Sequence, residues 1–114
     1  MVALFIILNK KEYLEDILSI FVNFHVKGAT IIDSQGMASA IVKGEIHDLP
    51  LFGSLKTLLQ GSHPYNKTIF SVLKEELVEE VVREIKKLMS AEKKPGIGFM
   101  FTIPVNNIYL FNDK

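Results

Sequence analysis

The chain has 114 residues, of which 48% are hydrophobic and 23% charged, a composition that predicts one soluble globular domain over residues 1–114 and excludes a disordered chain. Thirteen basic residues balance 13 acidic ones, so no overall field attracts nucleic acid or an anionic membrane. Because cysteine is absent, disulfides and thiolate zinc sites are excluded, which is typical of a reducing compartment.

The first predicted element is a strand over residues 2–8. This run, VALFIIL, is apolar on both of its alternating faces, which indicates a central strand covered on both sides. It is too short for the hydrophobic region of a signal peptide, and no stretch in the sequence approaches the length of a membrane span. We therefore expect a cytoplasmic protein.

A helix is predicted next, running to about Phe24. Asn9 is the predicted N-cap, with Glu12 three positions later as in a capping box, and apolar residues then recur at helical spacing. His25 falls on the same apolar stripe, where a half-buried structural histidine is expected. Gly28 is expected to take the left-handed conformation that ends the helix or turns the chain.

A second strand is predicted over residues 29–34 from its β-branched residues, and a long loop of about 35–67 follows it. The loop is apolar in its second half, and residues 54–60 could form a short helix. The remaining elements are strands over 68–72, 97–104 and 108–111 and a helix over 75–89.

Two βαβ halves predict an α+β fold: a ferredoxin-like βαββαβ sandwich with an antiparallel sheet, two helices on one face and a short C-terminal strand. Either alternating set of side chains in residues 2–8 is apolar, so the face without helices would present an apolar patch. We expect the chain to associate through that face.

Two clusters of polar residues are candidates for binding. Residues 93–98, KKPGIG, place two lysines and two glycines before a strand, where backbone amides and Lys can hold phosphate, although the glycines also suit a simple turn and bulge. In the long loop, His47, Asp48 and His63 offer nitrogen and oxygen ligands for a divalent metal, together with Glu45. Their spacing matches no metal motif, so solvated loop residues are the alternative.

The sequence shows no catalytic apparatus. No Ser or Thr has a paired base at a readable spacing, and no pair of acids stands out, so we expect the chain not to be an enzyme. The aromatic residues Phe99, Phe101, Tyr109 and Phe111 lack the interleaved Arg or Lys of an RNA-binding surface. Core packing is the expected role, and no nucleic-acid partner is expected.

The order of elements, the long loop and two local motifs resemble the nitrogen regulatory PII signalling proteins and their PII-like relatives. The motifs are VKGAT at 26–30, leading to Gly36, and KPGIGFMF at 94–101, which is similar to the family's glycine-rich B-loop and the strand after it. The resemblance covers almost the whole chain.

The resemblance implies a homotrimer of ferredoxin-like subunits that senses a small ligand in the clefts between subunits and signals to a partner through the long T-loop. By position it implies nucleotide-binding roles for Thr30, Gly36, Lys94, Gly96 and Gly98. The implied ligand is an adenine nucleotide (AMP, ADP or ATP). The apolar loop residues that would meet a target protein, a membrane transporter or an enzyme, are Leu49, Leu51, Phe52 and Leu55.

Several positions at which the family carries cations are uncharged here, among them Ser39, Phe99 and Leu110. A ligand with less charge than ATP, such as AMP, ADP, a cyclic nucleotide or a small anion, is therefore an alternative, and so is a trimer that has lost nucleotide binding altogether. A different class of function is a metal-binding trimer that resembles the copper-tolerance proteins of the same fold, with His47, Asp48 or His63 as ligands.

Overall fold

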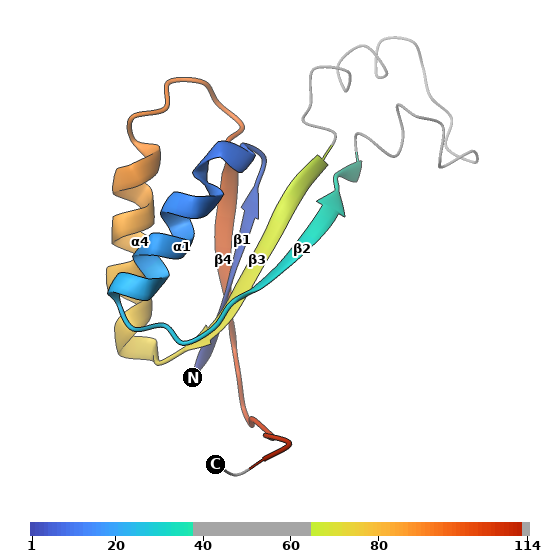
Figure 1. The fold of residues 1–114 in the computed structure, drawn as a ribbon, viewed down its shortest axis with the longest axis vertical. Coiled ribbons are helices and arrows are strands. Elements are labelled where there is room, and N and C mark those ends of the chain that lie inside the picture. Colours follow the sequence, from blue (N-terminus) through green and yellow to red (C-terminus); the bar gives the residue numbers. More distant parts are fainter. Residues whose placement is uncertain (38–64, 113–114) are drawn as a thin grey trace, which may run out of the picture.

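The computed structural model describes residues 1–37 and 65–112. In chain order these residues form β1 (Val2–Leu8), the short 3₁₀ helix η1 (Lys11–Tyr13), α1 (Leu14–Asn23), β2 (Thr30–Gln35), β3 (Tyr65–Leu73), α4 (Glu75–Met89) and β4 (Gly98–Pro104) (Figure 1). The predicted α+β, ferredoxin-like architecture is confirmed. Within these ranges, none of the helices has the length and apolar character of a membrane span.

The predicted bounds of β1 and α4 are correct. The prediction for β3 is too short, because the strand already begins at Tyr65 and continues to Leu73. The predicted short helix over 54–60 lies outside the described residues.

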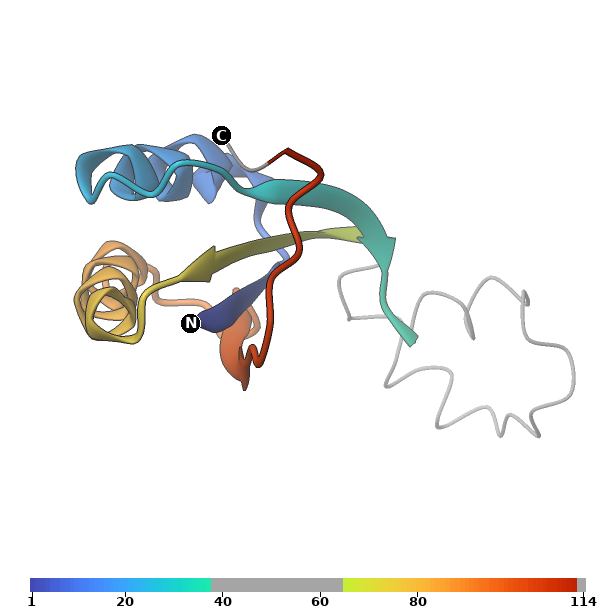
Figure 2. The same cartoon turned by 90° about the horizontal axis from the view of Figure 1, so that it is seen from below.

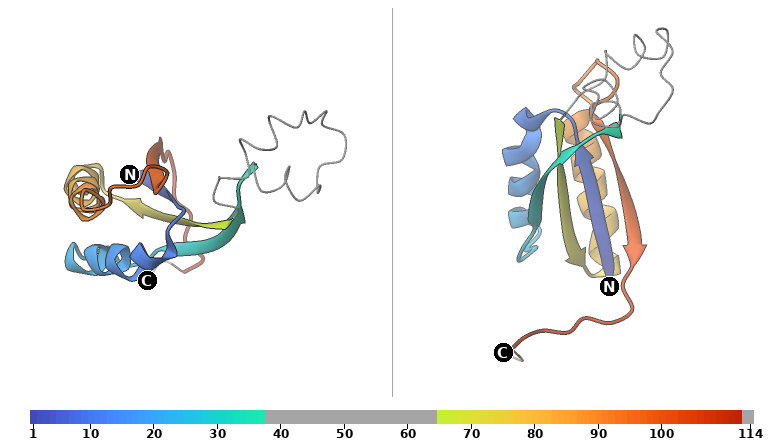
Figure 3. Two further views of the ribbon diagram at one scale, coloured as in Figure 1. Left: turned by 90° about the horizontal axis from the view of Figure 1, so that it is seen from above. Right: turned by 90° about the vertical axis from the view of Figure 1, so that its right-hand side faces the viewer.

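All neighbouring strands of the sheet are antiparallel, in the order β2-β3-β1-β4. The register places Phe5 of β1 opposite Phe70 of β3 and Phe101 of β4. Both helices lie on one side of the sheet, and in the described part of the chain the other side carries none (Figures 2 and 3). We call this uncovered side the open face.

The core lies between the sheet and the helices. Leu4, Ile6 and Leu8 of β1 alternate toward the helices and are almost fully buried. They pack against apolar side chains that recur at helical spacing on α1 and α4. Alternate residues of the strand and every third or fourth residue of the helices thus form one core. Its other members are Ile17 and Phe21 of α1, Ile69 and Leu73 of β3, and Val78, Val81 and Ile85 of α4.

His25, not Gly28, ends helix α1, so both predictions for these residues are wrong. His25 has a φ of 60°, and its N–H bonds to Val22 O, while Val26 N–H bonds to Phe21 O. These two hydrogen bonds form a Schellman motif, which satisfies carbonyls of the last turn. The imidazole follows the helix and is exposed, because the left-handed residue turns it away from the apolar stripe.

The open face carries a row of stacked aromatic rings. Phe5 stacks on Phe70 at a centroid distance of 5.2 Å and on Phe101 at 5.0 Å, and Phe99 lies 6.1 Å from Phe101. Phe99 and Phe101 are 61% and 41% exposed. The expected core role of these two residues is therefore wrong for the single chain, whereas the expected apolar patch is present.

The predicted C-terminal strand over residues 108–111 is absent from the described structure, and Tyr109 and Phe111 are exposed rather than packed in a core. Val105 N–H still bonds to Met1 O, at 3.1 Å, as a continuation of the β4–β1 pairing. Beyond this point β1 has ended, so among residues 1–37 and 65–112 no further strand lies beside this segment to pair with it.

Truncation of Val81 tests the position of the core. Val81→Ala should lower the free energy of unfolding by about 2 kcal/mol, because Val81 is fully buried between the helices and the sheet. The matched control is Val22→Ala on α1, where the side chain is 70% exposed and the change should be within about 0.5 kcal/mol of zero. Urea denaturation measures both values, and equal losses would contradict this assignment.

Candidate functional site

The loop between α4 and β4, which carries the predicted phosphate-binding residues, is held by Asn9. The backbone N–H of Asn9 bonds to Ile97 O at 2.7 Å, and its side-chain Nδ2 donates to Gly96 O at 2.8 Å. Asn9 therefore does not cap a helix as predicted. It lies where the β1–β4 pairing ends, and its amide group extends that pairing by one further hydrogen bond to the loop.

Glu92 connects the same loop to the segment between β1 and α1. Its Oε2 accepts a hydrogen bond from the Tyr13 hydroxyl at 3.0 Å and forms an ion pair with Lys10 Nζ at 2.9 Å. Its Oε1 lies 3.4 Å from the backbone N–H of Lys94, which donates to it. The loop is thus fixed at Glu92, Lys94, Gly96 and Ile97.

These contacts change the pKa values of all three side chains. The hydrogen bond from Lys10, followed by those from Tyr13 and the Lys94 N–H, lowers the pKa of Glu92 below its ordinary value. The hydrogen bond to Glu92 raises the pKa of Lys10 and also that of Tyr13. The ionised carboxylate is therefore the form that the folded chain favours.

Packing and backbone conformation require both glycines of the loop motif. Gly96 has a φ of 80°, in the left-handed region. Gly98 has a φ of 149°, and a Cβ at this position would lie 2.0 Å from Ile7 O of the neighbouring strand. The turn-and-bulge interpretation accounts for these glycines without a ligand, while Lys93 and Lys94 remain exposed on the loop.

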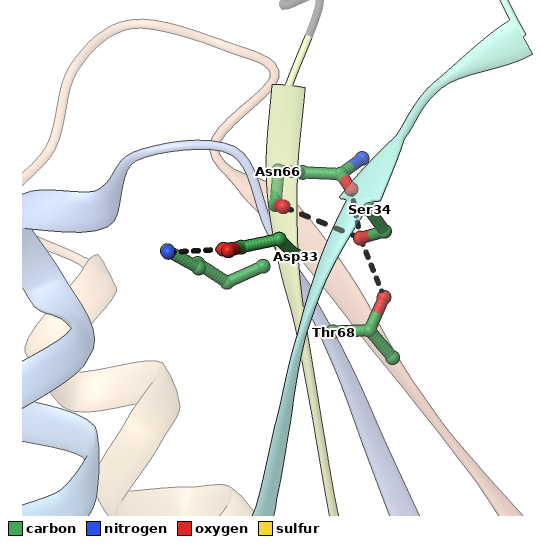
Figure 4. A network of polar contacts seen from close by, with 5 residues as sticks. Asp33, Ser34, Asn66 and Thr68 are labelled. Atoms are coloured by element: carbon green, nitrogen blue, oxygen red, sulfur yellow. Dashed lines mark hydrogen bonds and ion pairs between the residues drawn. The ribbon is translucent and has the colours of Figure 1, made fainter.

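Thr30 and Gly36, the other predicted nucleotide-binding residues, lie at the first residue of β2 and just after its end. The open face near the end of β2 carries a hydroxyl network, in which Ser34 Oγ contacts Asn66 Oδ1 and lies 2.8 Å from Thr68 Oγ1 (Figure 4). On the opposite side of β2, Asp33 pairs with Lys67, whose hydrogen bond lowers the pKa of Asp33.

A single chain does not bring the two predicted groups together. The register places Asp33, Lys67, Leu8 and Gly98 in one row across the four strands. Three strand spacings of about 4.8 Å separate the ends of this row, roughly 14 Å in all. Lys94, Gly96 and Gly98 thus lie at the β4 edge, and Thr30 and Gly36 lie at the β2 edge.

The remaining predicted site residues lie outside the described residues. These are the metal-ligand candidates His47, Asp48 and His63 and the partner-binding candidates Leu49, Leu51, Phe52 and Leu55. Within residues 1–37 and 65–112, no three His, Asp or Glu side chains gather in a way that could hold a metal ion.

No protein-family model matches the chain, and no curated protein matches its sequence.

Substitution of Gly98 tests the close approach of β4 to β1. Gly98→Ala should lower the free energy of unfolding by at least about 2 kcal/mol, because the added Cβ meets backbone atoms of Ile7 and the φ is unfavourable for alanine. The control is Gly28→Ala, where a Cβ meets nothing within 4 Å. Thermal unfolding of both variants compares them, and a Gly98→Ala protein as stable as the control would refute this explanation.

Removal of the Glu92 charge should destabilise the chain in a pH-dependent way. Because folding lowers the pKa of Glu92, its carboxylate stabilises the fold above the unfolded pKa of about 4.5, and this contribution disappears as the pH falls through the folded pKa. Glu92→Gln should therefore be less stable than the wild type at pH 7, with the difference narrowing below about pH 4.5.

Glu80→Gln at an exposed position of α4 is the control, and it should differ little from the wild type across the same range. Urea unfolding at several pH values measures the differences. A Glu92→Gln deficit that stays constant down to pH 3 would contradict the role given to the carboxylate.

Proposed function

We propose that the chain is a PII-like regulatory protein: a homotrimer that holds an adenine nucleotide between subunits and signals to a target protein through the loop of about 35–67. The observation that carries this proposal is the anchored loop before β4. Asn9 and Glu92 fix its backbone, while Lys93 and Lys94 remain exposed at the edge of the sheet. A fixed loop binds an anion without a large loss of conformational entropy on binding.

The separation of the two groups of predicted residues favours a ligand site between subunits. The β4 edge carries Lys94, Gly96 and Gly98, and the β2 edge carries Thr30 and Gly36. A head-to-tail contact, with the loop before β4 of one subunit against the β2 edge of the next, would join the two groups. Repetition of one such contact closes into a ring when its rotation allows.

The open face supports self-association. Its stacked aromatic rings and neighbouring aliphatic side chains form an apolar surface that no helix covers in the described part of the chain. Large exposed apolar patches of this kind mark protein interfaces. Burial of this surface among subunits would remove it from water and supply the free energy of assembly.

The charges near the loop favour a ligand of modest charge. Lys93 and Lys94 are the exposed cations of the loop, whereas Lys10 is engaged by Glu92. Two ammonium groups and backbone amides suit AMP or ADP better than a triphosphate, whose desolvation requires more positive charge. Signalling then requires that the ligand prefers one conformation of the subunit or loop over another.

Two measurements test the proposal. The mass of the protein in solution gives its oligomeric state, and titration calorimetry with AMP, ADP, ATP and cyclic AMP, with and without magnesium, measures ligand binding. We expect a trimer in solution and saturable binding of one of these ligands, with one site per subunit. Lys94→Ala should weaken that binding at least about tenfold, because a charge-assisted hydrogen bond is lost.

The matched control is Lys74→Ala, an exposed lysine at the opposite end of the sheet, which should leave the affinity unchanged. Absence of binding heat with every ligand would refute the nucleotide role, and a monomeric mass at all concentrations would refute the trimer.

A further inference from the structure

The edge strand β4 is uncovered on the helix side as well as on the open face. Helix α4 lies over β1 and against α1, and in β4 Met100 alone is half-buried. A groove of about 680 Å³ separates α4 from β4. Its aliphatic lining includes Val78, Val82, Ile85, Met89 and Met100.

The outer edge of β4 also offers free backbone groups. Hydrogen bonds from Asn9 to Ile97 and from Val105 to Met1 show that odd-numbered residues of β4 face β1. The even-numbered residues Gly98, Met100 and Thr102 therefore direct their N–H and C=O groups outward, where the described chain supplies no strand. An edge of this kind accepts an added strand.

The segment after β4 has the complementary character. Four consecutive apolar residues are all exposed: Ile108, Tyr109, Leu110 and Phe111. The lowest exposed fraction among them is 49%, at Ile108. The hydrogen bond from Val105 to Met1 keeps the chain in the direction of β4 for one residue beyond that strand. The segment therefore leaves the sheet at the end opposite the loop before β4 (Figure 1).

We propose that residues 107–112 of a second copy add as a strand to the outer edge of β4. Alternation along the added strand would place Ile108 and Leu110 in the aliphatic groove beside α4. Tyr109 and Phe111 would then lie on the open face, where they extend the row of aromatic rings formed by Phe5 and Phe101. The inference rests on the self-association in the proposed function and identifies the segment that would hold neighbouring subunits together.

A second copy is favoured over the chain's own tail for two reasons. Pro104, an outward-facing residue, has no N–H, so a tight hairpin back along the edge would lack a donor at its first position. The bond from Val105 to Met1 also directs the tail away from its own groove. A tail-in-groove contact is head-to-tail and therefore suits a closed ring.

Cross-linking tests this contact directly, because the chain has no cysteine of its own. Leu110→Cys and Glu79→Cys, the latter at the rim of the groove, are refolded together and treated with a short bis-maleimide. We expect a cross-linked pair that contains one copy of each variant. The control replaces Glu79→Cys with Glu80→Cys, an exposed residue on the far face of α4, and should give no such pair.

A further variant carries Leu110→Cys and Glu79→Cys in the same chain. Two results would overturn the inference. One is that the mixed single variants give no cross-link above the level of the control, and the other is that the double variant gives a cross-link only at the mass of one chain. The second result would mean that each tail folds back on its own groove.

Sedimentation of Leu110→Asp supplies an independent measurement. A carboxylate forced into the aliphatic groove should weaken self-association at least about tenfold, whereas Asn106→Asp, which adds the same charge at an exposed position before the added strand begins, should have little effect. Leu110 is exposed in the single chain, so the substitution leaves the core intact. If wild type and Leu110→Asp associate equally, this inference fails and the proposed function stands. If the wild type is monomeric at every concentration, the proposed trimer fails together with this inference.

Discussion

The structure depends on β1, a central strand that is apolar on both faces. It pairs with β3 on one side and β4 on the other, and its even-numbered residues form the floor of the core beneath the helices. Because side chains of a strand alternate, the odd-numbered residues must point to the opposite face. Phe5 therefore lies at the centre of the open face, with aromatic neighbours on both adjacent strands. The same alternation creates both the stable core and the exposed apolar surface of the open face.

The candidate site follows from how the chain leaves and enters this central strand. Asn9 follows the end of β1 and Gly98 begins β4, so the loop before β4 lies beside the segment before α1. Glu92 reaches across to Lys10 and Tyr13 and fixes the two segments to each other. Backbone conformation and packing account for Gly96 and Gly98 without a ligand. The exposed lysines on the anchored loop are therefore stronger support for a binding site than the glycines are.

In the part of the chain that the structure describes, the edge of the sheet at β4 and the segment after it are both uncovered. The helix covers β1 and leaves β4 with outward backbone groups and an aliphatic groove, while four apolar residues of the tail lie in solvent. Exposed apolar edges of this kind favour association and are seldom left uncovered in folded proteins. The proposed self-association would cover both surfaces at once, beside the loop that leads into the same strand.

The sequence by itself determined the elements whose signals are local. A short run that is apolar on both alternating faces defines β1, and the 3.6-residue stripe with acids at its start and lysines at its end defines α4. From these elements the ferredoxin-like order could be predicted. The candidate loop could also be located, because two glycines and two lysines stand together before β4.

Tertiary structure alone decided the roles of residues whose partners are distant in the chain. Asn9 has the local pattern of a helix cap, yet it bonds to Gly96, 87 residues away, and Glu92 has no local signal for its contact with Tyr13, 79 residues away. Residues 108–111 have strand-like composition, but no strand of the described part of the chain lies beside them. A strand forms only where another strand lies beside it, and a polar side chain bonds to a partner that the fold brings near. Residues adjacent in the sequence predict neither the second strand nor the partner.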